Sequence, residues 1–176
     1  MKLTHRLAAA AALAAPAILL SAAASAAPAH SSVTSAPACG TSLETWFAPE
    51  GDGFAGGEGY VVEFSNIGSA ACTVKGYPTV KLTENGTQVG LKATLFGPAP
   101  ATVTLQHGQT THIALIIQDA GIFCTPVPTN GLSVQAPGST QAQDFALTAF
   151  GACRGKSTVS VDAINPGTGI PHYTIR

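Results

Sequence analysis

Four cysteines are the residues of this sequence with the clearest chemistry, and they stand at Cys39, Cys72, Cys124 and Cys153. Structural zinc sites draw their thiolates in close pairs, because one turn must present two of them to one ion. Here the nearest two cysteines are 29 residues apart. This spacing argues against zinc and, in an oxidising compartment, indicates two disulfides, for which three connectivities are possible.

Two histidines and one carboxylate, His107, His112 and Asp119, come nearest to a catalytic or metal-binding cluster. On one continuous strand, His112 and Asp119 point to opposite faces because an odd number of positions separates them. His107 precedes Gly108 in a predicted turn without a third ligand nearby. We interpret these histidines as surface imidazoles. We predict no catalytic residue, no cofactor and no metal ligand, since the sequence also lacks the Gly-x-Ser-x-Gly elbow of a serine nucleophile.

Two glycine-rich segments resemble binding motifs but do not fit them. Residues 151–157 read Gly-Ala-Cys-Arg-Gly-Lys-Ser, with three residues rather than four before the Gly-Lys-Ser of a phosphate-binding loop, and strand-like sequence follows. We interpret them as a turn held by a disulfide. Residues 50–58 carry three carboxylates, but Phe54 stands where an EF-hand loop needs an oxygen ligand, so we expect a solvated hairpin loop.

Two interpretations fit Trp46, the only tryptophan of the chain: a platform that stacks on carbohydrate, or a residue packed in the core or sheet. Its place beside Phe47, on a strand that starts near Cys39, favours packing. The segment Asn85-Gly86-Thr87 matches a glycosylation sequon. Its Asn-Gly pair also predicts a tight hairpin turn, which explains the segment without glycosylation.

The N-terminus has the organisation of a secretory signal peptide. Lys2 and Arg6 precede an apolar run over residues 7–20, and a small-residue cleavage site ends at Ala26. The apolar run is short for a membrane span, and we expect no stable span after cleavage. We therefore predict a secreted, extracellular protein. The expected organisation is a signal peptide, a flexible leader and one domain, at residues 1–26, 27–38 and 39–176.

The composition of the mature chain limits its partners and its fold. Without the signal peptide, six Lys and Arg residues stand against nine Asp and Glu residues, a formal net charge of −3. The chain contains no basic run, which argues against nucleic-acid binding. Glycine and proline recur throughout the mature region and leave little room for a long helix.

Short alternating segments predict an all-β fold. In residues 60–66, Tyr60, Val62 and Phe64 should face the core. Residues 139–148 have a helix as the less favoured alternative, because Gln and Ala favour helix. Regularly spaced short strands are typical of an antiparallel β-sandwich. Further strands are predicted at residues 41–47, 79–83, 101–105, 111–118, 131–135, 144–148 and 158–164.

The strand order also suggests how the cysteines pair. Cys39 stands at the start of the first strand, and Cys72 follows the turn after the second. Because these two ends meet in an antiparallel pair, a bridge from Cys39 to Cys72 is the natural one, and Cys124 then joins Cys153 by elimination. Each bridge should stabilise the fold by roughly 3 to 4 kcal/mol on the chain-entropy model.

Several motifs follow one another along the chain in a fixed order. They are the early Cys39, Phe64-Ser65-Asn66, Cys72-Thr73, Gly76-Tyr77-Pro78, the Gly108 turn, Cys124 and Cys153. Their order resembles a family, the secreted actinobacterial domain of unknown function 4232, over about residues 39–165. The resemblance implies an immunoglobulin-like sandwich outside the membrane and carries no established activity. His107 and the tail at residues 167–176 depart from the family pattern.

We therefore expect a secreted, non-enzymatic binding or interaction module whose partner is an extracellular protein or a cell-envelope glycan. Loops on a rigid scaffold usually carry such specificity, and residues 48–58 and 119–130 are the candidates. Three alternatives stay open. They are a proteinase inhibitor that presents the disulfide-stapled loop at residues 121–130, a passive envelope component, and a hydrolase with an unrecognised site.

Overall fold

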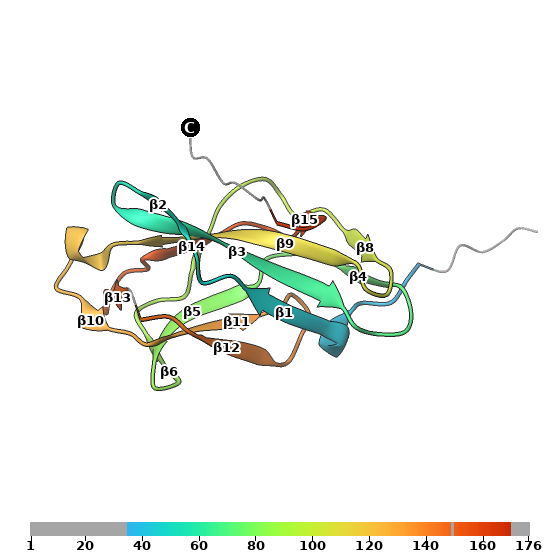
Figure 1. Cartoon of the computed structure of the whole chain (residues 1–176), viewed down its shortest axis with the longest axis horizontal. Helices are drawn as coiled ribbons and strands as arrows, with labels where there is room; N and C mark the ends of the chain where they lie inside the picture. The colour runs from blue at the N-terminus through green and yellow to red at the C-terminus, as the bar shows by residue number, and fades with distance from the viewer. Residues whose placement is uncertain (1–34, 149, 170–176) are drawn as a thin grey trace, which may run out of the picture. The chain divides into compact units, whose positions relative to one another are not determined.

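The computed structural model describes residues 35–148 and 150–169, which form two β-sheets packed face to face (Figure 1). The predicted signal peptide and all but the last four residues of the predicted leader lie outside the described residues, as does the end of the tail. In the first sheet the strand order is β1-β3-β9-β14-β7, while β2 also pairs with β3 and β15 with β9. The second sheet has the order β12-β11-β5-β6.

The first sheet consists of β1 (Leu43–Phe47), β2 (Asp52–Phe54), β3 (Gly57–Asn66), β7 (Thr94–Leu95), β9 (Thr110–Gln118), β14 (Val159–Val161) and β15 (Asn165–Pro166). The second consists of β5 (Thr79–Glu84), β6 (Thr87–Val89), β11 (Gly131–Gln135) and β12 (Ala142–Ala146). Two short pairs join β4 (Cys72–Val74) to β8 (Val103–Leu105) and β10 (Val127–Pro128) to β13 (Gly151–Ala152). Two 3-10 turns are η1 (Gly40–Ser42) and η2 (Ala120–Ile122).

The chain crosses repeatedly between the two sheets, as in an immunoglobulin-like sandwich. It runs through β1 and β3 in the first sheet, β5 and β6 in the second, β9 in the first, and β11 and β12 in the second. Neighbouring strands pair antiparallel, except that β14 pairs with β7 in parallel. The predicted all-β sandwich is therefore confirmed.

The core lies between the sheets and follows the predicted alternation. Tyr60, Val62 and Phe64 of β3 are buried, while residues between them are only partly covered. Because β9 is the neighbour of β3 and is apolar on both faces, it continues this buried layer. Large buried side chains beside β3, in β9, are Ile113, Leu115 and Ile117. Those of the second sheet are Val80, Leu82, Leu132 and Val134.

The predicted strands are present, with shifted bounds. Residues 142–146 form strand β12 rather than a helix, because β11 offers a full register of partners and Phe145 packs its ring on Phe47, 5.5 Å between centroids. The predicted strand at 158–164 is shorter, and the chain returns to β9 as β15. Asn85 and Gly86 have φ angles of 50° and 76°, which confirms the tight hairpin turn between β5 and β6.

Both predicted disulfides are present, with Cα atoms 4.8 Å apart in Cys39–Cys72 and 5.9 Å apart in Cys124–Cys153. The first bridge has a different local reason from the one we predicted, because Cys72 begins β4, which pairs with β8. The backbone before Cys39 instead runs beside β4. The Cys39 N–H donates to the Thr73 carbonyl at 2.8 Å, and the Thr73 N–H donates to the Pro37 carbonyl at 2.7 Å. The end of the predicted leader is thus bound to β4.

Candidate binding surfaces

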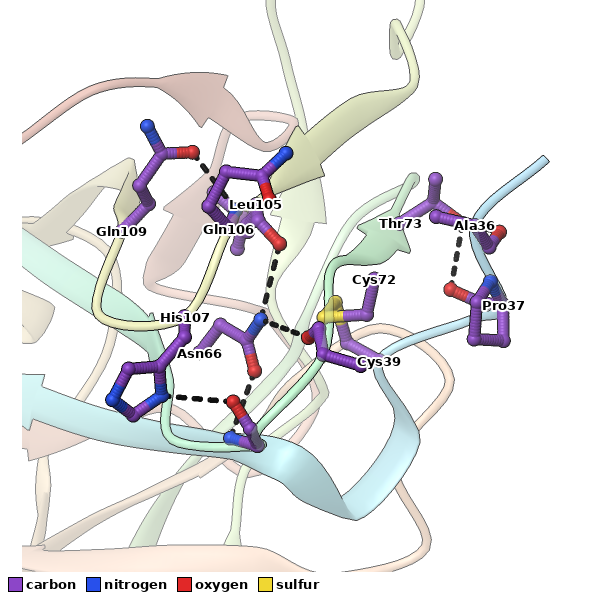
Figure 2. The surroundings of a disulfide bond; sticks show 12 residues. Ala36, Pro37, Cys39, Asn66, Cys72, Thr73, Leu105, Gln106, His107 and Gln109 are labelled. Carbon is purple, nitrogen blue, oxygen red and sulfur yellow. Dashed lines mark hydrogen bonds between the residues drawn. A yellow bond between two sulfur atoms is a disulfide. The ribbon is translucent and has the colours of Figure 1, made fainter. Parts of the chain in front are cut away.

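Asn66, the last residue of β3, organises the end of the sandwich near the first disulfide (Figure 2). Its side chain is 0% exposed. Its amide donates to the carbonyls of Ala70 at 2.9 Å and Leu105 at 3.0 Å, and its Oδ1 accepts from the Gly68 N–H at 2.9 Å. Because these partners come from the β3–β4 turn and from β8, the Phe-x-Asn motif joins two chain segments at this end.

His107 belongs to the same end and is exposed, as predicted. Its Nδ1 lies 2.9 Å from the Gly68 carbonyl, an atom that only accepts, so the Nδ1 carries the proton in this contact (Figure 2). The imidazole therefore links the β8–β9 turn to the β3–β4 turn, and we assign it a structural role.

The prediction that His112 is a surface imidazole is wrong. His112 is only 8% exposed, and its Nδ1 lies 3.0 Å from the Gly167 carbonyl. The chain after β15 crosses over β9 and covers this side chain, a contact between residues 55 positions apart that no local pattern indicates. Among the described residues, no group of three His, Cys, Asp or Glu side chains is placed to hold a metal ion.

The prediction that Trp46 packs in the core or sheet is also wrong, because its side chain is 54% exposed. Strand alternation decides its position. Phe47 takes the inward place and packs on Tyr60, with ring centroids 5.4 Å apart, so Trp46 points to the outer face of the first sheet.

The segment at 151–157 is the predicted turn beside a disulfide. After β13, Cys153 and Lys156 form an isolated antiparallel bridge, and β14 follows. A phosphate-binding loop requires a helix at this point so that its N-terminus faces the phosphates. The described chain has a strand there instead, and Arg154 and Lys156 project into solvent.

The two segments predicted to carry specificity meet at the opposite end of the sandwich, where Figure 1 shows β10, β13 and the β2–β3 hairpin. The Asp119 N–H donates to the Gly56 carbonyl at 2.8 Å. Residues 50–58 contain the predicted hairpin, in which β2 pairs with β3 up to Phe54↔Gly57. Loops at 48–58 and 119–130 therefore form one continuous surface.

The segment at 119–130 is fixed from both sides. The Asp119 side chain caps η2 by accepting from the Gly121 N–H at 2.9 Å. The second disulfide then joins Cys124 to the β13 turn. Between these two anchors Ile122 is 58% exposed and Phe123 is 41% exposed.

A cationic side chain, that of Lys156, lies next to these apolar ones. The Lys156 Nζ stands 3.8 Å from the centroid of the Phe123 ring, a cation–π contact. An open hollow of about 470 Å³ adjoins the turn after β13. Arg154, Val127 and Gln88 are among the residues that line it. We call the Ala55-Gly56 turn, Ile122, Phe123, Arg154 and Lys156 the loop-end surface.

Tyr60 and Glu58 form a hydrogen bond within β3 near this end of the sandwich. The Tyr60 hydroxyl donates to the Glu58 carboxylate at 2.6 Å. Burial, together with the hydrogen bond and the negative charge of Glu58, raises the pKa of Tyr60 well above its usual value, so the phenol stays protonated and remains a donor. The hydrogen bond therefore fixes the Glu58 side chain next to the turn between β2 and β3.

Comparison with known proteins identifies one related group. The model of a family described as "Domain of unknown function (DUF4232)" matches residues 39–165. No curated protein and no solved structure matches the chain. Within the described residues, no helix has the length and apolar character needed to cross a membrane.

Proposed function

Since the chain belongs to the DUF4232 family of domains of unknown function, we propose that it is a secreted, non-enzymatic binding module that contacts an extracellular protein through the loop-end surface. Two disulfides within the matched region support an oxidising compartment. Nothing in the family description supplies a ligand, so the proposal rests on the chemistry of this surface.

The observation that carries the proposal is a rigid, exposed apolar tip. Ile122 and Phe123 face solvent although the backbone on either side of them is anchored by the Asp119 cap and by the second disulfide. Aromatic residues and arginine are enriched at protein interfaces, where an apolar centre is surrounded by polar groups. A preorganised loop also loses little conformational entropy on binding. The loop-end surface combines these properties.

The geometry favours this function over the proteinase inhibitor. An inhibitory loop enters a protease as an extended, unpaired strand, so that its backbone can bond to the enzyme. Here Ala120–Ile122 form the 3-10 turn η2, and the αR conformation of Phe123 continues it. Val127–Pro128, farther along the same loop, already pair with β13.

An affinity capture with a matched variant pair tests the proposal. The oxidised domain serves as bait for proteins of the source organism's envelope and culture fluid, beside an Ile122→Ser/Phe123→Ser double variant. The control is Leu95→Ser, because Leu95 is 59% exposed and belongs to the edge strand β7 rather than to either loop. We expect a protein that the wild type and Leu95→Ser retain and that the double variant loses. Equal capture by all three baits would contradict the proposal.

A further inference from the structure

A row of four different side chains crosses the outer face of the first sheet. The strand registers place Trp46 opposite Glu63, Glu63 opposite His112, and His112 opposite Asn165. Directly opposed residues of neighbouring strands share a face, with Cβ atoms about 5 Å apart. The exposed indole of Trp46 therefore has the Glu63 carboxylate as its immediate neighbour.

A second row runs parallel to the first, two residues along the strands. It consists of Glu44, Ser65 and Thr110, again joined by direct register. The Ser65 and Thr110 hydroxyl oxygens lie 2.9 Å apart and form a hydrogen bond. Side chains two residues apart on one face are separated by about 7 Å along a strand. The two rows together place carboxylates and hydroxyls beside the indole across three neighbouring strands.

Residues 167–169, which follow β15, cover one side of this area. Their backbone accepts a hydrogen bond from His112 at Gly167 and donates one to the Glu63 Oε1 at Gly169, 2.7 Å long. His112 is thereby covered, whereas Trp46 remains exposed. A carboxylate has about four acceptor positions, so Glu63 retains capacity for further donors. We call Trp46, Glu44, Glu63, Ser65 and Thr110 the outer-face platform.

The chemistry of the platform indicates what it recognises. Lys and Arg do not occur within the described strands of the first sheet, whose charged residues are Glu44, Asp52, Glu58 and Glu63. An anionic ligand would therefore be repelled. The face of an indole carries negative charge density, which attracts the polarised C–H groups on one side of a pyranose ring. Carboxylates and hydroxyls beside it are suited to the sugar's hydroxyl donors.

We propose that the outer-face platform binds a neutral saccharide, with one pyranose ring stacked on Trp46 and its hydroxyls donating to Glu63 and Glu44. The Ser65–Thr110 pair takes a neighbouring hydroxyl, and the chain at Gly167–Gly169 forms the wall that limits the platform. This site is separate from the loop-end surface, since it lies on a sheet face rather than on the loops. It adds a glycan site to the proposed protein-binding function and does not depend on it.

The single tryptophan makes the test direct, because all indole emission comes from Trp46. Residues 27–176 are titrated with neutral oligosaccharides, namely cellohexaose, maltohexaose, mannohexaose and chitohexaose. We expect at least one of them to shift the emission maximum to shorter wavelength in a saturable way, as the indole leaves water. If none of them shifts the emission at millimolar concentration, the proposal is overturned.

Variants then separate stacking from incidental contact. Binding of the active oligosaccharide, measured by calorimetry, should weaken about tenfold or more in Trp46→Ala, by less in Trp46→Phe, and severalfold in Glu63→Gln. Leu95→Ala, in β7 and outside both proposed sites, should bind as the wild type does. Unchanged affinity in Trp46→Ala would refute the platform, provided that circular dichroism shows the variant folded. A loss in Leu95→Ala equal to that in Trp46→Ala would refute it as well.

Discussion

The buried side-chain amide of Asn66, at the end of β3, joins chain segments at the end of the sandwich that contains the first disulfide. It makes three hydrogen bonds at full burial, to Gly68, Ala70 and Leu105 (Figure 2). A buried polar group that loses its partner costs about 1–3 kcal/mol. The residue therefore acts through stability, and its position next to the Cys72 turn explains why a strand should end in asparagine.

Asn66→Ala should lower the free energy of unfolding by about 3 kcal/mol, because the Gly68 N–H and the Leu105 carbonyl lose their buried partner. Urea unfolding of the oxidised protein measures this change. His107→Ala is the matched control, since it removes one exposed hydrogen bond to the same turn and should cost less than about 1 kcal/mol. Similar losses in the two variants would show that Asn66 does not organise this end.

The carboxyl group of Asp162 makes the free energy of unfolding depend on pH. Its Oδ1 accepts from the Ala114 N–H at 2.7 Å, and its Oδ2 accepts from the Asn165 amide at 2.8 Å. Burial nevertheless raises the pKa of Asp162 above its ordinary value of 3.8, because the loss of solvation outweighs these hydrogen bonds and the nearby His112. Below the ordinary value the carboxyl is neutral in both states. As pH rises toward the raised native pKa, the unfolded state ionises first, and the native state loses stability.

The substitution Asp162→Asn removes the carboxyl group, and with it this contribution to the pH dependence of stability. Relative to the wild type, the free energy of unfolding of Asp162→Asn should therefore increase as the pH is raised from about 3 to about 6. Denaturant titrations of both proteins across this range measure the difference. A difference that falls with rising pH would mean that hydrogen bonding to the ionised carboxylate outweighs burial, and a constant difference would mean that the two effects cancel.

Among the elements, the β5–β6 hairpin requires a positive φ angle in its turn, and a single substitution tests this requirement. Gly86 has a φ of 76°, and a Cβ at this position would meet nothing within 4 Å. Gly86→Ala should thus destabilise the fold by about 1 kcal/mol through backbone strain alone.

Gly155→Ala is a close control for this prediction, because Gly155 also has open space around it but does not have a positive φ. Thermal or urea unfolding of the two variants should show a loss for Gly86→Ala and little change for Gly155→Ala. Equal stability of the two would contradict the type of turn that the Asn-Gly pair indicates.

The second disulfide is the element that holds the loop-end surface. It joins residues separated by 29 positions, for which chain entropy predicts a stabilisation of about 3 to 4 kcal/mol. The double variant Cys124→Ser/Cys153→Ser should lose this amount in urea unfolding. In the same variant, amide exchange should accelerate at η2 and remain slow in β3 and β9. Unchanged exchange at η2 would show that the Asp119 cap alone fixes the loop.

Local patterns predicted the elements better than their contacts. The alternation around Tyr60, Val62 and Phe64 identified a core strand, and Asn85-Gly86 identified a hairpin, because each depends on neighbouring residues. The burial of His112 depends on a segment 55 positions away, and periodicity carries no information about it. The outward position of Trp46 follows from the strand alternation, because its neighbour Phe47 takes the inward position of β1.

The candidate surfaces also combine features that the local sequence predicts with contacts that it does not predict. Composition identified residues 48–58 and 119–130 as loops. The contact between them is a backbone hydrogen bond from the Asp119 N–H to the Gly56 carbonyl, and residue type does not predict it because almost any pair of residues could form it. The outer-face platform was missed because its members come from three strands. Only the register of β1, β3 and β9 brings Trp46 beside Glu63. Such cross-strand neighbours become visible once strand pairing is known.

At the scale of the whole molecule, two disulfides fasten the two ends of one β-sandwich, and two surfaces of different chemistry remain open. The loop-end surface is apolar with Arg154 and Lys156 beside it, and the outer-face platform is acidic with one indole. A rigid scaffold with separate exposed surfaces is suited to holding a protein partner and a glycan at the same time. We propose that the loop-end surface is a specific contact site for a protein.

Site-specific photocrosslinking in the source organism's culture tests this claim most directly. A photoreactive residue is placed at Ile122 in one protein and at Leu95 in another, because these two side chains are almost equally exposed, 58% and 59%, but only Ile122 belongs to the loop-end surface. We predict a discrete adduct from position 122 that unlabelled domain competes away, and no such adduct from position 95. No adduct from position 122, or the same adducts from both positions, would contradict a specific loop-end contact.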